Sequence, residues 1–279
     1  MNNSNFLIGV ILEALGYRLL LVISFLGLFT ACRKDGDFEG IALISHGGMG
    51  LENPNSFYHD NSFESIEMAQ AINGCDGVEM DLQLSADGSL WLYHDVSLES
   101  RTNQKGCIYN STDEFLTQVS YRTLHQERLV NLEFVSKSLD RAKTIFLDLR
   151  HFSSCDQLIV PVGKVINALS FSFPDKKGLI VITNYRPWIE QLKQAGFRVC
   201  LQVENIEGFL VTESLSISPD SYLLRNSDIT SDGVTKIRQA GKKIYIFEVR
   251  SPKGIRSALK KIPDGILTDD IRAAILEKK

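Results

Sequence analysis

The sequence predicts a (β/α)8 barrel, the TIM barrel, with a small polar insertion after the second strand. Short runs rich in Val, Ile and Leu alternate with segments of helical period, which is typical of parallel βαβ units. About eight such units follow one another, and a length of 279 residues suits this closed barrel. The first strand leads into His46-Gly47-Gly48, which lacks the glycine spacing of a dinucleotide-binding turn. An open doubly wound sheet is therefore the less favoured alternative.

The expected strands are short apolar runs. They span residues 41–45, 77–82, 144–149, 179–183, 198–203, 222–224, 243–249 and 265–268. Residues 97–125 are polar and irregular and break the alternation, so we expect the insertion there.

The expected helices are amphipathic segments between these strands. They span residues 63–72, 132–142, 158–171, 188–195, 231–240, 252–260 and 270–277. In the first of them Phe63, Ile66 and Ile72 recur at helical spacing. Asn61-Ser62 has the residue types of a helix start, and Gly196 has that of a helix stop.

The N-terminus has the pattern of a bacterial lipoprotein signal. Arg18 precedes an apolar run that ends at Thr30-Ala31-Cys32, and a short run of this kind before small residues is typical of a secretory signal. We therefore expect a signal peptide over 1–31, a tether over 32–40 and the barrel domain over 41–279.

Cys32 would then be the lipidated residue of an exported protein anchored to a membrane of the bacterial cell envelope. The alternative is a membrane anchor that includes the apolar residues 6–12, but Glu13 and Arg18 interrupt that stretch.

The composition argues against one class of partner, nucleic acids, and does not decide whether the cysteines are oxidised. A net charge of -4 and a pI near 5.8 argue against a nucleic-acid-binding protein, which usually has a basic surface.

Four cysteines follow Cys32, and they lack the closely spaced pairs of a zinc site. Export would allow them to oxidise, but spacing alone leaves buried free thiols and a disulfide as alternatives. These cysteines are Cys75, Cys107, Cys155 and Cys200.

Two acidic residues alternate along the second expected strand. Glu79 and Asp81 point to one face of it, while Val78 and Met80 point to the other. Because apolar residues fill that other face, the carboxylates are expected to point into an enclosed space, where like charges need a cation between them. Carboxylate oxygens favour Mg²⁺, Ca²⁺ or Mn²⁺ over zinc. Taken alone, such a pair is more often a solvated sheet face.

Two histidines, His46 and His94, stand at strand ends around these acids. Imidazoles near a metal suit general acid and general base catalysis, so the set indicates metal-assisted hydrolysis or phosphoryl transfer. A lone histidine is more often structural. However, His46, Asp81, Asp148 and Arg250 all lie at expected C-terminal strand ends, where TIM barrels place their active sites.

The ordered set of motifs resembles the glycerophosphodiester phosphodiesterase family, whose members are metal-dependent (β/α)8 barrels. The resemblance covers nearly all of the chain after the N-terminal segment. The matching motifs are His46-Gly47-Gly48, Asp60-Asn61-Ser62, Asp76-Gly77-Val78-Glu79-Met80-Asp81, His94-Asp95 after Asp87-Gly88, Arg101-Thr102, Asp148-Leu149-Arg150, Phe247-Glu248-Val249-Arg250 and Asp264-Gly265-Ile266-Leu267-Thr268-Asp269.

The resemblance implies hydrolysis of small-molecule glycerophosphodiesters to glycerol 3-phosphate and an alcohol, with a divalent metal, Mg²⁺ or Ca²⁺, as cofactor. It also implies metal ligands, an acid and base pair, and substrate-binding residues. Which histidine is the acid and which the base stays open. The metal ligands would be Glu79, Asp81 and Asp148, the acid and base His46 and His94, and the substrate-binding residues Asn61, Arg150 and Phe247.

Several positions depart from the family pattern. Gly47 stands where the family has an arginine that holds the phosphate, so another cation is expected to reach it. Arg250 is the first choice, Arg150 the second and Arg101 the third, and the alternative for Arg250 is a solvated charge paired with Glu248. Two other functions stay open: a phospholipase of C or D type acting on lipid or phosphoinositol head groups, and a surface lipoprotein that binds phosphodiesters without cleaving them.

Overall fold

The structure is a computed structural model that describes residues 38–279 except 52, 54–55, 151–154, 156–158 and 216–217. The expected signal peptide and Cys32 lie outside the described residues. No helix in the described part of the chain is both long enough and apolar enough to cross a membrane.

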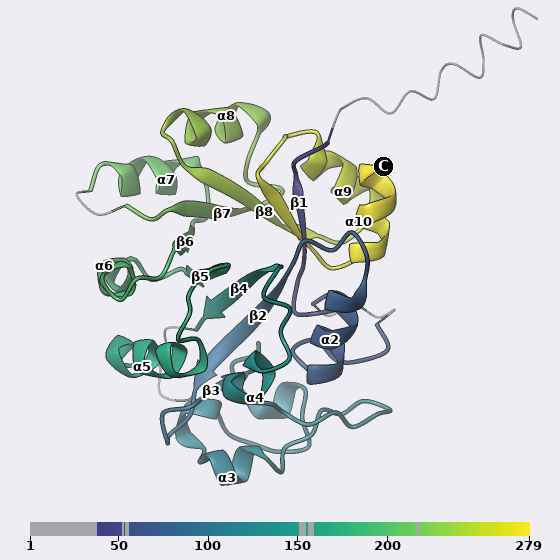
Figure 1. Cartoon of the computed structure of the whole chain (residues 1–279), viewed down its shortest axis with the longest axis vertical. Coiled ribbons are helices and arrows are strands. Elements are labelled where there is room, and N and C mark those ends of the chain that lie inside the picture. Colours follow the sequence, from purple (N-terminus) through teal and green to yellow (C-terminus); the bar gives the residue numbers. More distant parts are fainter. Residues whose placement is uncertain (1–37, 52, 54–55, 151–154, 156–158, 216–217) are drawn as a thin grey trace, which may run out of the picture. The chain divides into compact units, whose positions relative to one another are not determined.

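Eight parallel strands close into a barrel, as the alternating pattern predicts (Figure 1). The barrel closes because β1 pairs in parallel with both β2 and β9. The parallel strands are β1 (Ala42–Ser45), β2 (Gly77–Leu84), β4 (Thr144–Leu149), β5 (Leu179–Thr183), β6 (Val199–Gln202), β7 (Ser221–Arg225), β8 (Lys243–Val249) and β9 (Gly265–Thr268).

Helices alternate with these strands and surround the barrel (Figure 1). The first helix begins where expected, because the Ser62 side chain accepts a hydrogen bond from the Ser65 amide and so caps it. The helices between the barrel strands are α2 (Phe63–Ala71), α4 (Leu132–Ser136), α5 (Val162–Ser172), α6 (Ile189–Gln194), α7 (Ile206–Glu213), α8 (Ser231–Gln239) and α9 (Pro252–Leu259), and α10 (Ile271–Lys278) follows β9.

The helix α7 is one that the sequence pattern did not predict. It contains Gly208, and its apolar residues do not form one stripe, because Leu210 and Val211 are exposed while Phe209 is buried. Asn205 caps it by accepting a hydrogen bond from the Gly208 amide. The helix therefore depends on its cap and on the packing of Phe209 rather than on a periodic apolar face.

Strand residues alternate between two apolar layers. Inward-pointing side chains such as Ile44, Phe146 and Tyr245 fill the barrel, and outward-pointing ones such as Val78 and Met80 pack under the helices. Glu79 and Asp81 alternate with that outer set, so they point into the barrel as predicted.

The insertion follows β2, but it is less polar than its sequence indicated. It begins with β3 (Leu90–Leu92), which returns antiparallel to β2, and it includes the short helix α3 (Asp113–Leu116). The insertion has an apolar core of its own. The sequence did not reveal this core because turns and short helical segments interrupt the hydrophobic periodicity. That core consists of Trp91, Tyr93, Leu98, Ile108, Leu116, Val119, Tyr121 and Leu129.

A disulfide joins Cys107 of the insertion to Cys155, which follows β4, with 5.8 Å between their Cα atoms. Cys75 and Cys200 are buried free thiols. Both alternatives that the sequence left open are therefore found: one pair of cysteines forms a disulfide, and the other two are buried free thiols.

Candidate active site

The three predicted acids meet at the C-terminal mouth of the barrel. The register of β2 and β4 sets Asp81 directly beside Asp148, and Glu79 lies two residues earlier on the same face. Carboxylate oxygens of all three lie within 4.8 Å of one another, and Glu79 and Asp81 are almost completely buried. The sheet therefore concentrates up to three negative charges in one buried place.

The electrostatics of this cluster favour a cation. Burial raises the pKa of Glu79 well above its usual value, and the neighbouring charge of Asp81 raises it further. Within the described part of the chain, Oε1 of Glu79 is buried and has no hydrogen-bond partner. An unpaired carboxylate oxygen beside two other carboxylates is a donor set that fits a hard divalent cation.

Arg150 and Asn61 both hold Asp81. Arg150 forms a short ion pair with Oδ1 of Asp81 and lies 3.7 Å from Oδ2 of Asp148. Asn61 donates from its amide nitrogen to Oδ2 of Asp81 at 2.8 Å and accepts from the Asp81 backbone amide at 2.9 Å. Burial alone would raise the pKa of Asp81, but the Arg150 guanidinium holds it below its usual value.

His46 follows β1 and is held by a carboxylate that follows β9. Its Nδ1 lies 2.8 Å from Oδ1 of Asp269, and its Nε2 lies 3.8 Å from Oε2 of Glu79. Burial alone would lower the pKa of His46, but the hydrogen bond to Asp269 and the charge of Glu79 raise it to about 9. Because Asp269 accepts from Nδ1, the other ring nitrogen is the one that faces the acids.

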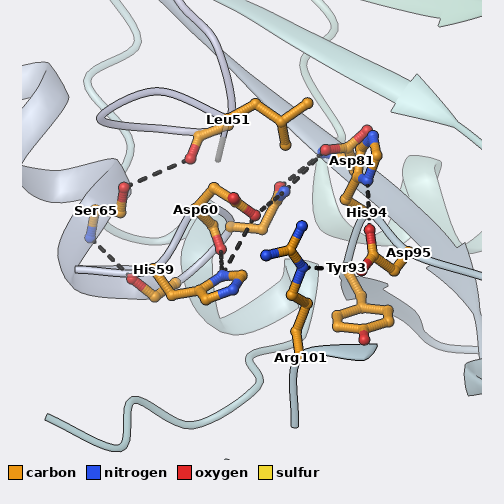
Figure 2. Close-up of polar contacts among 12 residues, drawn as sticks. Leu51, His59, Asp60, Ser65, Asp81, Tyr93, His94, Asp95 and Arg101 are labelled. Carbon is orange, nitrogen blue, oxygen red and sulfur yellow. Dashed lines mark hydrogen bonds and ion pairs between the residues drawn. The ribbon is translucent and has the colours of Figure 1, made fainter. Parts of the chain in front are cut away.

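His94 reaches the site by a different route, since it follows β3 and not a barrel strand. The antiparallel return of β3 brings the neighbouring Tyr93 amide within 3.1 Å of the Asp81 carbonyl oxygen. Nδ1 of His94 lies 2.8 Å from Oδ1 of Asp95, and Figure 2 shows the imidazole and this carboxylate facing one another. Burial alone would lower the pKa of His94, but the Asp95 hydrogen bond and the charge of Asp81 raise it.

Arg101, from the insertion, extends toward the same place (Figure 2). Its Nε donates to Oδ2 of Asp95 at 3.1 Å. Arg101, His94 and Asp95 line one narrow space together with His59 and Asp60. The insertion therefore supplies both a histidine and a cation to the mouth of the barrel.

A family comparison agrees with this geometry. The sequence profile of the glycerophosphoryl diester phosphodiesterase family matches residues 46–162, a span that contains both histidines and all three acids. Over this span the chain is similar to the family. Its members are phosphoric diester hydrolases, and the chain is assigned to that enzyme class.

Named relatives in the family cover most of the chain. A glycerophosphodiester phosphodiesterase of Bacillus altitudinis is 24% identical over 229 residues, which are 76% of this chain and 89% of that protein. A solved Agrobacterium tumefaciens structure, named as a candidate glycerophosphoryl diester phosphodiesterase, matches with a TM-score of 0.74 at 18% identity. The match covers 85% of this chain and 97% of that one.

A third relative was solved with a reaction product. It is an Oleispira antarctica phosphodiesterase in complex with sn-glycerol-3-phosphate, and it matches with a TM-score of 0.69 at 19% identity. The match covers 85% of this chain and 96% of that one. Both solved structures share the barrel fold with this chain.

The departure of this phosphodiesterase at Gly47 has a structural basis. Gly47 has φ +59°, and a Cβ there would lie 3.1 Å from Cβ of Asp60. A residue with a side chain would be strained in this backbone conformation. A cation at this place would therefore have to come from another part of the chain.

The three arginines that the sequence suggested as sources of this cation have different partners in the structure. Nε of Arg250 donates to Oδ2 of Asp269 at 3.2 Å, and the other oxygen of this carboxylate contacts His46. The alternative for Arg250 was a solvated charge paired with Glu248. The Arg250 side chain is 55% exposed, but Glu248 pairs with Arg225 at 3.1 Å. Arg150 contacts the acids, and Arg101 contacts Asp95.

The remaining predicted site residue, Phe247, packs against the apolar cluster inside the barrel and lies under the guanidinium of Arg225, whose central carbon is 5.4 Å from the ring centre. Sequence reasoning gave no role to Asp269, Asp95 or His59. The signal for Asp269 was present, because it directly follows a strand whose neighbour in the closed barrel is the strand before His46.

Proposed function

We propose that this chain hydrolyses glycerophosphodiesters to glycerol 3-phosphate and an alcohol, with a divalent metal held by Glu79, Asp81 and Asp148. The observation that carries this proposal is the three-carboxylate cluster, with Glu79 and Asp81 buried and Asp148 partly buried, between two His–Asp pairs. When bound, the cation would polarise the phosphate oxygens and lower the pKa of the attacking hydroxyl.

The two histidines would move the protons. Each imidazole is held at Nδ1 by a carboxylate, Asp269 for His46 and Asp95 for His94. The second nitrogen of each ring is thus the one available to the substrate. One histidine takes the proton of the attacking hydroxyl, and the other gives a proton to the leaving alcohol.

Other residues would bind and orient the substrate. Arg150 and Arg101 carry the positive charge nearest to the acids and to His94, so they would neutralise phosphate oxygens. Asn61 would keep the Asp81 carboxylate in place through its two hydrogen bonds. Phe247 would form an apolar wall at the inner face of the barrel.

A substrate panel with phosphorus NMR tests this proposal. The purified protein is incubated with glycerophosphocholine, glycerophosphoethanolamine and glycerophosphoinositol, each with Mg²⁺, Ca²⁺ or Mn²⁺ and each with excess chelator. We expect glycerol 3-phosphate to appear with metal and to be absent with chelator. Turnover that is unchanged by chelator would argue against a role of the metal in hydrolysis. Binding without turnover of any diester indicates a binding protein in place of an enzyme.

We also propose that the protein is exported and anchored through a lipid on Cys32. The N-terminal signal pattern supports this, and the Cys107–Cys155 disulfide is the kind of bond that persists in an oxidising compartment. Labelling of growing cells with an alkyne fatty acid should mark the parent protein but not Cys32→Ser. Equal labelling of both would contradict lipidation at Cys32.

A further inference from the structure

Basic side chains gather at the end of the barrel where the strands start, opposite to the candidate active site. Exposed Lys or Arg residues precede or begin five of the eight barrel strands. They are Arg141 before β4, Lys177 before β5, Arg198 before β6, Lys243 at the first position of β8 and Lys260 before β9. We call these five residues the basic face. The whole chain has a net charge of -4, so the rest of the molecule carries a net negative charge.

The aspartates at the same end are occupied by other groups. Asp76, Asp220 and Asp264 each accept a hydrogen bond from the first or second amide of a neighbouring strand. They also pair with cations outside the basic face, namely Lys278, Lys193 and Arg238. Asp140 and Asp175 accept amides within their own turns. In the described part of the chain, no carboxylate forms an ion pair with a residue of the basic face.

The cations of the basic face are directed to solvent. The ammonium groups of Lys177, Lys243 and Lys260 have no hydrogen-bond partner among the described residues. Arg141 and Arg198 donate only to backbone carbonyl oxygens, which leaves their charge uncompensated. The basic face is therefore available to a partner that carries negative charge.

An exposed apolar residue stands beside these cations. Ile262 follows Lys260 by two positions and is 52% exposed. Its backbone has φ +54°, a conformation that β-branched residues rarely adopt. Basic residues beside an exposed apolar side chain are typical of a surface that lies on an anionic membrane.

The N-terminal segment joins the barrel at this same end. The amide of Ala42, the first residue of β1, donates to the Asp264 carbonyl oxygen at 3.0 Å, and Lys278 donates to the Ile41 carbonyl oxygen at 2.6 Å. Five residues separate Cys32 from Phe38, the first described residue. Because an extended chain spans at most about 3.5 Å per residue, a lipid on Cys32 would hold this end within about 20 Å of the bilayer.

We propose that the basic face binds the anionic phospholipid head groups of the membrane to which Cys32 is anchored, so that the mouth of the barrel faces away from the bilayer. The inference goes beyond diester hydrolysis and rests on the proposed lipid anchor for the choice of membrane. The bilayer would attract the basic face and repel the negatively charged remainder of the molecule, which sets the orientation. The candidate active site then stays open to soluble substrates.

Vesicle co-sedimentation tests the basic face without the lipid anchor. The protein used is residues 33–279, because residues 38–279 form a compact unit with its own apolar core. The vesicles are phosphatidylcholine alone or an equimolar mixture with phosphatidylglycerol. We expect binding to the mixed vesicles only. Binding at about 0.1 M salt should be lost at about 1 M, where the Debye length falls from about 10 Å to about 3 Å.

A matched pair of triple variants tests the residues. Lys177→Gln with Lys243→Gln and Lys260→Gln should lower the partition coefficient about 100-fold, since each Lys near an anionic surface contributes about fivefold. The control is Lys164→Gln with Lys253→Gln and Arg272→Gln. It removes three exposed charges in the first turns of α5, α9 and α10, at the mouth end, and should change the partition coefficient little. Both variants should keep the parental melting temperature, because the substitutions are on the surface.

Three outcomes would overturn the inference. Equal binding of the parent protein to both kinds of vesicle shows that anionic head groups are not recognised. Equal loss in the two triple variants assigns binding to overall charge and not to the basic face. Binding of heparin without binding of mixed vesicles assigns the face to a soluble polyanion. None of these measurements depends on turnover, so a failure of the proposed hydrolysis is detected separately with glycerophosphocholine.

Discussion

Nδ1 of His46 and Oδ1 of Asp269 lie 2.8 Å apart, although 223 positions separate the two residues in the sequence. The pair exists because β1 and β9 are neighbours in the closed barrel, so the residues after their C-terminal ends meet. The same carboxylate also accepts from the Leu51 amide at 3.1 Å and from Arg250. Asp269 therefore fixes both the orientation and the tautomer of His46.

Replacing Asp269 by Asn should lower kcat by about 10²-fold or more and change KM little. Asn can donate where Asp accepts, so the imidazole would turn or take the other tautomer. Steady-state kinetics with glycerophosphocholine measures the effect. Asp270→Asn is the control, because Asn caps α10 as well as Asp does. A change in KM alone would assign Asp269 to substrate binding.

The same pair predicts a pH-dependent stability of the metal-free protein. The folded-state pKa of His46 is raised from 6.5 to about 9, so the folded protein keeps a proton that the unfolded chain loses. The stabilisation is fully present below about pH 6.5 and is lost as the pH rises through about 9. Urea titrations in chelator should therefore show a parent-minus-Asp269→Asn difference that shrinks over this range. A difference that stays constant would contradict this linkage.

Glu79→Gln and Asp81→Asn should abolish metal-dependent turnover and leave the fold intact, because each removes a negative ligand at nearly constant volume. In chelator, Glu79→Gln should also raise the melting temperature, since it removes one buried charge beside Asp81. Glu67→Gln, on the exposed face of α2, is the control. Near-parental rates at limiting metal would show that these residues do not bind the metal.

His94→Ala should lower kcat by about 10²–10⁴-fold, the usual contribution of a positioned acid or base. The structure supports this, because Asp95 holds the ring at Nδ1 and the charge of Asp81 helps to raise its pKa. The control is His125→Ala, an exposed histidine of the same insertion, which separates loss of the catalytic imidazole from general loss of a histidine there. If His94→Ala raises KM and leaves kcat unchanged, His94 binds substrate and does not transfer protons.

Arg250→Ala should lower kcat/KM by an amount equivalent to about 2–4 kcal/mol, the scale of a lost charged contact in the transition state. Arg250 also pairs with Asp269, so its loss could lower kcat/KM indirectly by shifting His46. The Arg250→Ala effect in an Asp269→Asn background distinguishes the two. An effect that persists there indicates contact with phosphate, and an unchanged kcat/KM in the single variant removes Arg250 from the site.

The sequence by itself determined the features that depend on near neighbours. Alternation of apolar strands and amphipathic helices predicted the barrel, and strand period two placed Glu79 and Asp81 on its inner face. These predictions were confirmed because side-chain direction within one strand or helix repeats over only a few residues. The helix α7 was missed because its apolar residues lack that repeat, and β3 was missed because it is only three residues long.

Only the tertiary structure decided which distant groups meet. Closure of β1 against β9 brought Asp269 to His46, the register of β2 and β4 set Asp148 beside Asp81, and the return of β3 carried His94 back to the mouth of the barrel. None of these contacts has a local signature, because each depends on strand order and register over the whole sheet. A cleft lined by Phe57 and Leu124 has the same origin, since these residues belong to two separate loops.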